Sequence, residues 1–266
     1  MAPRRPDGGI AEGLAERETL RLLGRGRLAL GVSLGTVLPE ERLVVAARWT
    51  SKALLIAERL DDRPFLAHAL RMHGNELRKA DHTRAAVARL KLATQVSADP
   101  EGRGTALALL ARAAGELGIA DLFDRAIEKY RCLLDSHGER GMLFNPFSFR
   151  EIHLRGLVNT GRAATAARII NTGHANASAI APQWQVIERV TAGQVLLAAG
   201  EGQAAQEALR TAVLEGESLR LPHQVQRAVR VAHHGGLDTI AADGHAALQR
   251  LRDRLEQPEA LSPAGS

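Results

Sequence analysis

Five prolines recur at a nearly constant spacing, and this feature constrains the fold more than any other. Pro64, Pro100, Pro146, Pro182 and Pro222 are separated by 36, 46, 36 and 40 residues. Proline is tolerated in the first turn of an α-helix, because its missing N–H would have no partner there in any case. The spacing therefore predicts that a helix begins at each proline, about every 40 residues.

Small and large apolar residues repeat at the same period. An alanine is followed four residues later by a larger apolar residue in four places: Ala86 with Leu90, Ala126 with Tyr130, Ala166 with Ile170, and Ala205 with Leu209. A small residue at a fixed point of each repeat allows two helices to approach closely.

A helix-breaking segment lies between each of four prolines and the alanine that follows it. These segments are 78–83, 117–121, 159–163 and 198–202. Glycine or aspartate there can end one helix and cap the next. Each unit is thus predicted to be a helical hairpin, which cannot bury its own apolar face and must stack on its neighbours.

Composition narrows the class of protein. Hydrophobic residues make up 45% of the 266 residues but aromatic residues only 3%, which argues against β-sandwiches and barrels. The net charge is +5, yet arginine alternates with acidic residues instead of gathering in a patch, so nucleic-acid binding is not favoured. Only four of the 35 basic residues are lysine, a bias typical of GC-rich bacterial genomes.

The location of the protein is inferred from what the sequence lacks. Cys132 is the only cysteine, which excludes an internal disulfide and fits a reducing cytoplasm. The N-terminus has no apolar segment typical of a signal peptide, and no stretch approaches the ~20 apolar residues of a membrane helix. We expect a soluble cytoplasmic protein, with Cys132 packed in a helix interface.

The repeating units resemble the tetratricopeptide (TPR) repeat, in particular the sensor regions of actinobacterial regulators. Residues 67–100 carry the family pattern best, with the positions Leu70, His73, Gly74, Leu77, Ala86, Leu90, Ala93 and Pro100. Residues 107–133 and 186–212 also match, whereas 147–173 match least because Leu154 stands where a small residue is expected. The resemblance implies an all-α, right-handed superhelix of five or six stacked hairpins. It would form a single domain over residues 15–256, between disordered tails at 1–14 and 257–266.

Gly74 and Asn75 are unusual inside a helical stretch, since a mid-helix glycine costs roughly 1 kcal/mol relative to alanine. In the repeat register, Gly74 shares a packed face with Leu70 and Leu77 and makes room for a neighbouring helix. Asn75 points the other way, toward the groove. Gly74→Leu is therefore predicted to destabilise the protein more than Asn75→Leu.

The resemblance also implies that the first helix of each unit lines a concave groove that binds a peptide. The groove positions that follow from it are His68, Arg71, Met72, Asn75, Arg78, Lys79, Arg112, Arg155, Asn159 and Gln194. Helical spacing independently places Arg71, Asn75 and Arg78 on one face.

Some of these residues suggest what the groove binds. Arg71 and Asn75 match two positions at which relatives that bind a C-terminal carboxylate carry lysine and asparagine. Ser148 and Ile152 stand where a further basic pair would be expected, so the clamp is incomplete. Arginine pairs with carboxylates and asparagine with a peptide backbone, so a peptide or protein segment, which could carry a carboxylate, is the expected partner.

Two motifs with catalytic or metal-binding associations lack the required context. Ser33 lies in a G-x-S-x-G match, but that motif needs a strand before it, and the flanks are helical in pattern. His68 and His73 are five residues apart, and His233 and His234 are adjacent, whereas a helical metal pair needs a spacing of four. We expect His73 to pack near a turn and His233–His234 to lie at a helix end.

The sequence thus predicts a non-enzymatic module without metal or cofactor that binds a protein segment in a regulatory or signalling role. The main alternative is a structural homodimer or scaffold whose groove is filled by its own terminus. A nucleic-acid-associated regulator is less favoured.

Overall fold

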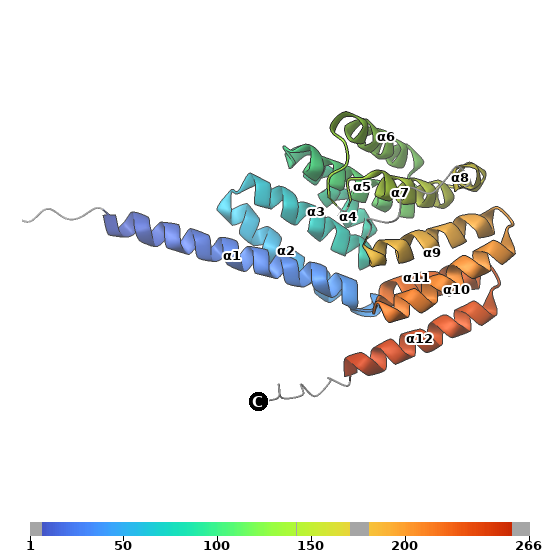
Figure 1. Cartoon of the computed structure of the whole chain (residues 1–266). Helices are drawn as coiled ribbons and strands as arrows, with labels where there is room; N and C mark the ends of the chain where they lie inside the picture. The colour runs from blue at the N-terminus through green and yellow to red at the C-terminus, as the bar shows by residue number, and fades with distance from the viewer. Residues whose placement is uncertain (1–6, 142, 171–180, 257–266) are drawn as a thin grey trace, which may run out of the picture. The chain divides into compact units, whose positions relative to one another are not determined.

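The chain is built from helices throughout its described part. The structure is a computed structural model that describes residues 7–141, 143–170 and 181–256, and all regular elements in these ranges are helical (Figure 1). The predicted all-α class is confirmed. The predicted C-terminal tail, 257–266, and the first six residues of the N-terminal tail lie outside the described residues.

Contacts between residues divide the chain into two compact units, Met1–Arg162 and Ala163–Ser266, where the sequence predicted a single repeat domain. The first unit contains α1 (Asp7–Val37), the 3-10 helix η1 (Glu40–Arg42), α2 (Val44–Leu60), α3 (Arg63–Lys79), α4 (Thr83–Val96), α5 (Pro100–Glu116), α6 (Ala120–His137) and α7 (Pro146–Asn159). The second contains α8 (Ala163–Ile170), α9 (Pro182–Ala198), α10 (Gly202–Ser218), α11 (Pro222–His234) and α12 (Asp238–Glu256). Helix α1 begins at Asp7, inside the stretch predicted to be a disordered tail.

All five spaced prolines stand in the first turn of a helix, as predicted. Pro64 is the second residue of α3, and the other four are the first residues of α5, α7, α9 and α11. Three of these helices also have a side-chain cap, in which Asp62, Asp99 and Asn145 accept a hydrogen bond from a backbone N–H three residues on. These caps satisfy donors that have no partner within the helix.

The four predicted breaks are the turns between paired helices. Each turn contains a residue with positive φ: Asp81, Gly118, Gly161 and Gly200. The following N–H then reaches back to a carbonyl five residues earlier, as in the 2.8 Å bond from His82 N to Leu77 O. This pattern is the Schellman ending, which satisfies the last carbonyls of a helix.

Hairpin packing follows the predicted register at its clearest points. Helices α3 and α4 pack together, as do α9 and α10. A Cβ on Gly74 would lie 2.7 Å from Leu90 Cγ, and a Cβ on Gly193 would lie 2.6 Å from Leu209 Cγ. Both pairs are 16 residues apart, so the same close contact recurs in the two units.

Three details differ from the sequence prediction. Leu77 is only partly buried, whereas Leu70 and Gly74 are fully packed. In α7 the closely packed small residue is Gly156, against Phe123 of α6, and Leu154 is simply a buried core residue. Cys132 is exposed, because it lies two residues after the buried Tyr130 and therefore on the opposite side of α6.

Helix α5 is the centre of the first unit. It packs against α3, α4, α6 and α7, and every residue from 106 to 115 is buried. A helix that is covered on all sides is normally apolar throughout. The one charged residue in this stretch, Arg112, is therefore held by specific partners.

Candidate binding face on helices α3, α5 and α7

Five charged side chains meet across the three helices, and we call them the arginine–glutamate cluster: Arg78, Arg112, Glu116, Glu151 and Arg155. Arg78 Nη1 lies 2.6 Å from Glu116 Oε1, and Arg155 Nη2 lies 3.4 Å from the same oxygen. Arg112 Nη2 lies 2.5 Å from Glu151 Oε2, with Arg155 Nη1 3.7 Å from Glu151 Oε1. The cluster therefore links α3 to α5 and α5 to α7.

The repeat explains why these charges face one another. Arg112 and Glu116 are four residues apart on α5, and Glu151 and Arg155 are four apart on α7 in the reverse order. Residues four apart share a helix face. Both pairs between α5 and α7 span 39 residues, so that Arg112 stands opposite Glu151 and Arg155 opposite Glu116.

The cluster is largely removed from solvent. The side chains of Arg78, Arg112 and Arg155 are 7–9% exposed and that of Glu151 is fully buried, whereas Glu116 is 27% exposed. Burial lowers the pKa of Arg112 to about 10; Glu151 opposes that shift, and the two other arginines add to it. The cluster thus reaches solvent mainly at Glu116.

Glu116 is held as a carboxylate by its arginine partners. Burial by itself would raise the pKa of this carboxyl group, but Arg78 and Arg155 together lower the pKa below its ordinary value. Opposite charges within a few ångströms favour the ionised form in this way.

A second ionic group lies beside the cluster, around Glu76 of α3. Glu76 Oε1 accepts hydrogen bonds from Lys79 Nζ at 3.0 Å and from Asn75 Nδ2 at 3.2 Å. Lys79 also donates to Gly35 O of α1 at 3.0 Å. Glu76 is fully buried, its Oε2 has no partner among the described residues, and burial raises its pKa.

Five of the predicted groove residues belong to these two groups: Asn75, Arg78, Lys79, Arg112 and Arg155. Arg78 Nη2 donates to Asn75 Oδ1 at 3.2 Å, which confirms that these two share a face. The carboxylates of the same face engage the cationic groups among them, and their place in a peptide-binding groove stays a prediction.

The other predicted groove residues lie apart from the cluster. Arg71 Nη1 donates to Ser97 Oγ at 3.3 Å, and His68 is exposed. Met72 packs against the hydrophobic core of the first unit. Asn159 is the last residue of α7 and is partly buried, and Gln194 belongs to α9 of the second unit.

Sequence reasoning missed the three glutamates that pair with the predicted cations. Glu76, Glu116 and Glu151 stand three or four residues from a basic residue on the same helix. That i, i+4 alternation of charge was visible in the sequence. It is typical of solvated helix faces, however, so the alternation alone does not indicate burial.

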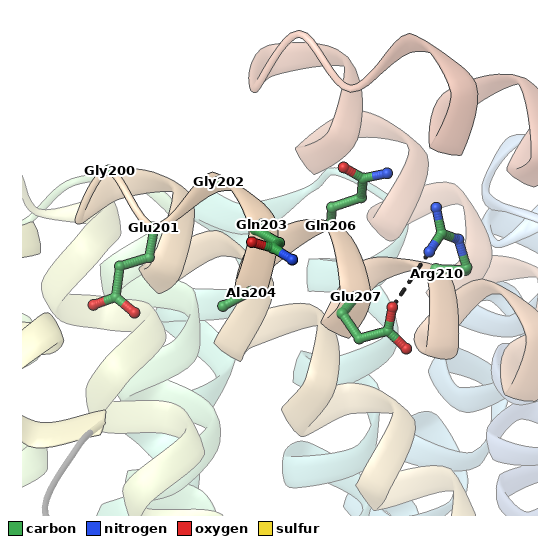
Figure 2. Close-up of a pocket in the computed structure, with 8 residues that line it drawn as sticks. All are labelled: Gly200, Glu201, Gly202, Gln203, Ala204, Gln206, Glu207 and Arg210. Carbon is green, nitrogen blue, oxygen red and sulfur yellow. Dashed lines mark hydrogen bonds and ion pairs between the residues drawn. The ribbon is translucent and has the colours of Figure 1, made fainter.

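A shallow hollow lies on the second unit, beside the start of α10. It is lined by Gly200, Glu201, Gly202, Gln203, Ala204, Gln206, Glu207 and Arg210, all from one helix and the turn before it (Figure 2). Their side chains point in different directions, and Figure 2 marks one contact among them, from Arg210 to Glu207 at 3.3 Å. A ligand site needs convergent polar groups, so this hollow is the weaker candidate.

The residues considered for catalysis or metal binding have other surroundings. Ser33 lies inside α1 instead of on a strand-to-helix turn. His73 is buried, with Nδ1 3.0 Å from Thr50 Oγ1, and His233 and His234 close the end of α11. In the ranges that the structure describes, no group of three or more histidine, cysteine or acidic residues is placed to hold a metal ion.

None of the helices in the described ranges is long and apolar enough to cross a membrane. Comparisons with protein-family models, with curated proteins and with solved structures return no match for this chain.

Proposed function

We propose that this chain is a non-enzymatic, TPR-like binding module with a regulatory or signalling role in a bacterial cytoplasm, and that the face of α3, α5 and α7 binds a segment of a partner protein. The observation that carries the proposal is the equivalence of Asn75, Arg112 and Arg155. Each stands four residues before the last residue of its helix. A right-handed superhelix that presents such a row on its concave side is part of the same proposal.

The chemistry of Asn75, Arg112 and Arg155, which we call the row, supports a polar partner segment. Asparagine both donates and accepts hydrogen bonds, which suits the backbone of an extended peptide. Arginine pairs with carboxylates through two parallel hydrogen bonds. Partly exposed side chains at the edge, such as Asn75 and Lys79, give a partner access to the row.

The test is a capture experiment that compares substitutions on two faces of the first unit. The wild-type chain and an Asn75→Ala/Lys79→Ala variant are used to capture proteins from native lysate, after circular dichroism has shown that both fold. We expect specific partners to be lost from the variant. Arg131→Ala is the matched control, because Arg131 is half-exposed on α6 and pairs with Glu128 and Asp135 of the same helix. Identical partners for all three chains would contradict the proposal, as would a loss that the Arg131 control shares.

One specific feature favours the alternative, a homodimeric scaffold. Leu23, Leu30 and Val37 recur every seven residues along α1 and are exposed by 45%, 41% and 43%. A helix that pairs with another helix carries apolar residues at two positions in every seven, and these three residues repeat at one such position. Gly26 lies between them with no described atom near its Cβ position, so its cost in helix stability has no packing reason within the described chain.

This alternative predicts dimers that depend on α1. Sedimentation equilibrium of the wild type would show association that Leu30→Arg abolishes. Leu55→Arg is the control, because Leu55 is an exposed leucine on α2, outside the seven-residue repeat of α1. A wild type that stays monomeric up to about 100 μM excludes the scaffold, since that concentration detects dimers with dissociation constants of micromolar order.

Nucleic-acid binding is the least supported function. Most of the arginines of the α3–α5–α7 face pair with carboxylates instead of standing free for phosphates. Binding of this type would weaken steeply with added salt, which a salt titration with duplex DNA tests directly.

A further inference from the structure

Glu116 occupies a clamp formed by two arginines from different helices. Arg78 comes from α3 and Arg155 from α7, and both contact the same oxygen, Glu116 Oε1. Glu116 itself belongs to α5, which lies between them. Charge-assisted hydrogen bonds from arginine to a carboxylate are the contacts with which proteins bind acidic ligands.

Glu116 is the cluster member best able to leave. It is the last residue of α5, where the negative end of the helix dipole disfavours an anion. Its side chain is also the most exposed of the five, at 27%, whereas the other glutamate of the cluster is fully buried. Departure of this carboxylate therefore opens the clamp without removing a residue of the hydrophobic core.

Departure of Glu116 would leave Arg78 and Arg155 without their shared carboxylate, so that another carboxylate would bind there favourably. Arg78 would lose the carboxylate that it contacts at 2.6 Å, and Arg155 would retain only the longer 3.7 Å contact with Glu151. A guanidinium group that is this poorly solvated is costly to leave without a counterion.

We propose that the Arg78–Arg155 clamp is a carboxylate-binding site that Glu116 occupies in the free chain, and that an acidic side chain of the partner takes the place of Glu116. The inference rests on the proposed function, because it names the chemistry of the segment that this face binds. Glu116 then acts as an internal competitor that weakens binding and restricts it to acidic partners.

The test measures the binding of a defined peptide to Glu116→Ala. The probe is a short peptide with blocked ends and one central glutamate, and its reference is the same peptide with glutamine. By calorimetry we expect Glu116→Ala to bind the glutamate peptide at least ten-fold more tightly than the wild type does, with no gain for the glutamine peptide. Glu217→Ala is the matched control, because it removes a glutamate that pairs with Arg250 in the second unit. This variant should bind the glutamate peptide with the same affinity as the wild type.

Thermal melting separates a clamp from a purely structural link between helices. In both cases Glu116→Ala melts at a lower temperature, but only a clamp lets the glutamate peptide restore the melting temperature while the glutamine peptide does not. If the alanine variant does not fold, Glu116→Gln keeps the side chain's shape and removes its charge. Equal affinities of the wild type and the variant, or equal rescue by both peptides, would overturn the inference.

This result is independent of the capture experiment. If Glu116→Ala binds the glutamate peptide more tightly than the wild type does, the clamp is supported. This holds even if no protein captured from lysate depends on Asn75 and Lys79. Conversely, partners lost from the Asn75→Ala/Lys79→Ala variant support the binding face even if the peptide shows no preference for the Glu116 variant.

Discussion

A Cβ atom added to Gly74 would lie 2.7 Å from Cγ of Leu90, much closer than two carbon atoms pack. The contact joins α3 to α4 at the middle of their hairpin. Gly193 and Leu209 repeat it in the second unit, at 2.6 Å. The glycine therefore offsets its cost in helix stability by allowing the two helices to come together.

Gly74→Leu should destabilise the protein far more than Asn75→Leu. The added side chain forces α3 and α4 apart, and overpacking of this kind costs about 1–3 kcal/mol or more. Asn75 is only partly buried, so leucine there meets less resistance, although its bond to Glu76 is lost. Urea unfolding of both variants measures the difference, and equal losses would contradict the repeat register.

Gly26→Ala is the control for the cost of glycine itself. Gly26 is also inside a long helix, but no described atom lies within 4 Å of its Cβ position. Alanine there should stabilise the chain by about 1 kcal/mol, because only the intrinsic helix preference changes.

Arg112→Met should cost about 3–5 kcal/mol, because it leaves the buried charge of Glu151 without its closest partner. The double variant Arg112→Met/Glu151→Leu should recover most of that loss, since both charges are then removed together. Free energies of unfolding of the two single variants and the double variant give the coupling between the residues. Additive losses would show that the 2.5 Å contact contributes little.

His73 should make the stability depend on pH. Burial lowers the pKa of His73 to about 4, from an ordinary value near 6.5. The unfolded chain therefore takes up a proton first as the pH falls, so this contribution to stability is complete above pH 6.5 and is lost progressively between pH 6.5 and 4. The slope from one histidine is at most about 1.4 kcal/mol per pH unit.

The measurement for His73 is the free energy of unfolding at several pH values between 4 and 7.5. His73→Asn should reduce the slope between pH 6.5 and 4 relative to the wild type. An unchanged slope would mean that His73 is not the group that titrates.

Asp99→Ala should destabilise the first unit by about 1 kcal/mol through the loss of a helix cap. Asp99 accepts a 2.6 Å hydrogen bond from Gly102 N at the start of α5, and caps of this type contribute about that much. Asp121→Ala, in the first turn of α6 but outside any side-chain cap, is the comparison in thermal unfolding. If Asp99→Ala lowers the melting temperature no more than Asp121→Ala does, the helix cap is not the cause of the destabilisation.

The sequence by itself determined where the five proline-containing helices begin and where four of the helix pairs turn. Proline at the start of a helix, an aspartate or asparagine cap and a positive-φ turn residue are local signals, set by neighbouring backbone atoms. For that reason the breaks at 78–83, 117–121, 159–163 and 198–202 each contain the turn between two helices. The close approach at Gly74 was also predictable, because the 16-residue spacing to Leu90 is set by the hairpin.

Only the tertiary structure decided which charges meet and which are buried. The partner of Arg78 is 38 residues away on a different helix, and the partner of Arg112 is 39 residues away. Which helices are adjacent, and which face of each turns inward, depends on the packing of several hairpins at once. That packing buried Arg78, Arg112 and Arg155 and paired each of them with a glutamate, because a buried charge requires a nearby charge of opposite sign.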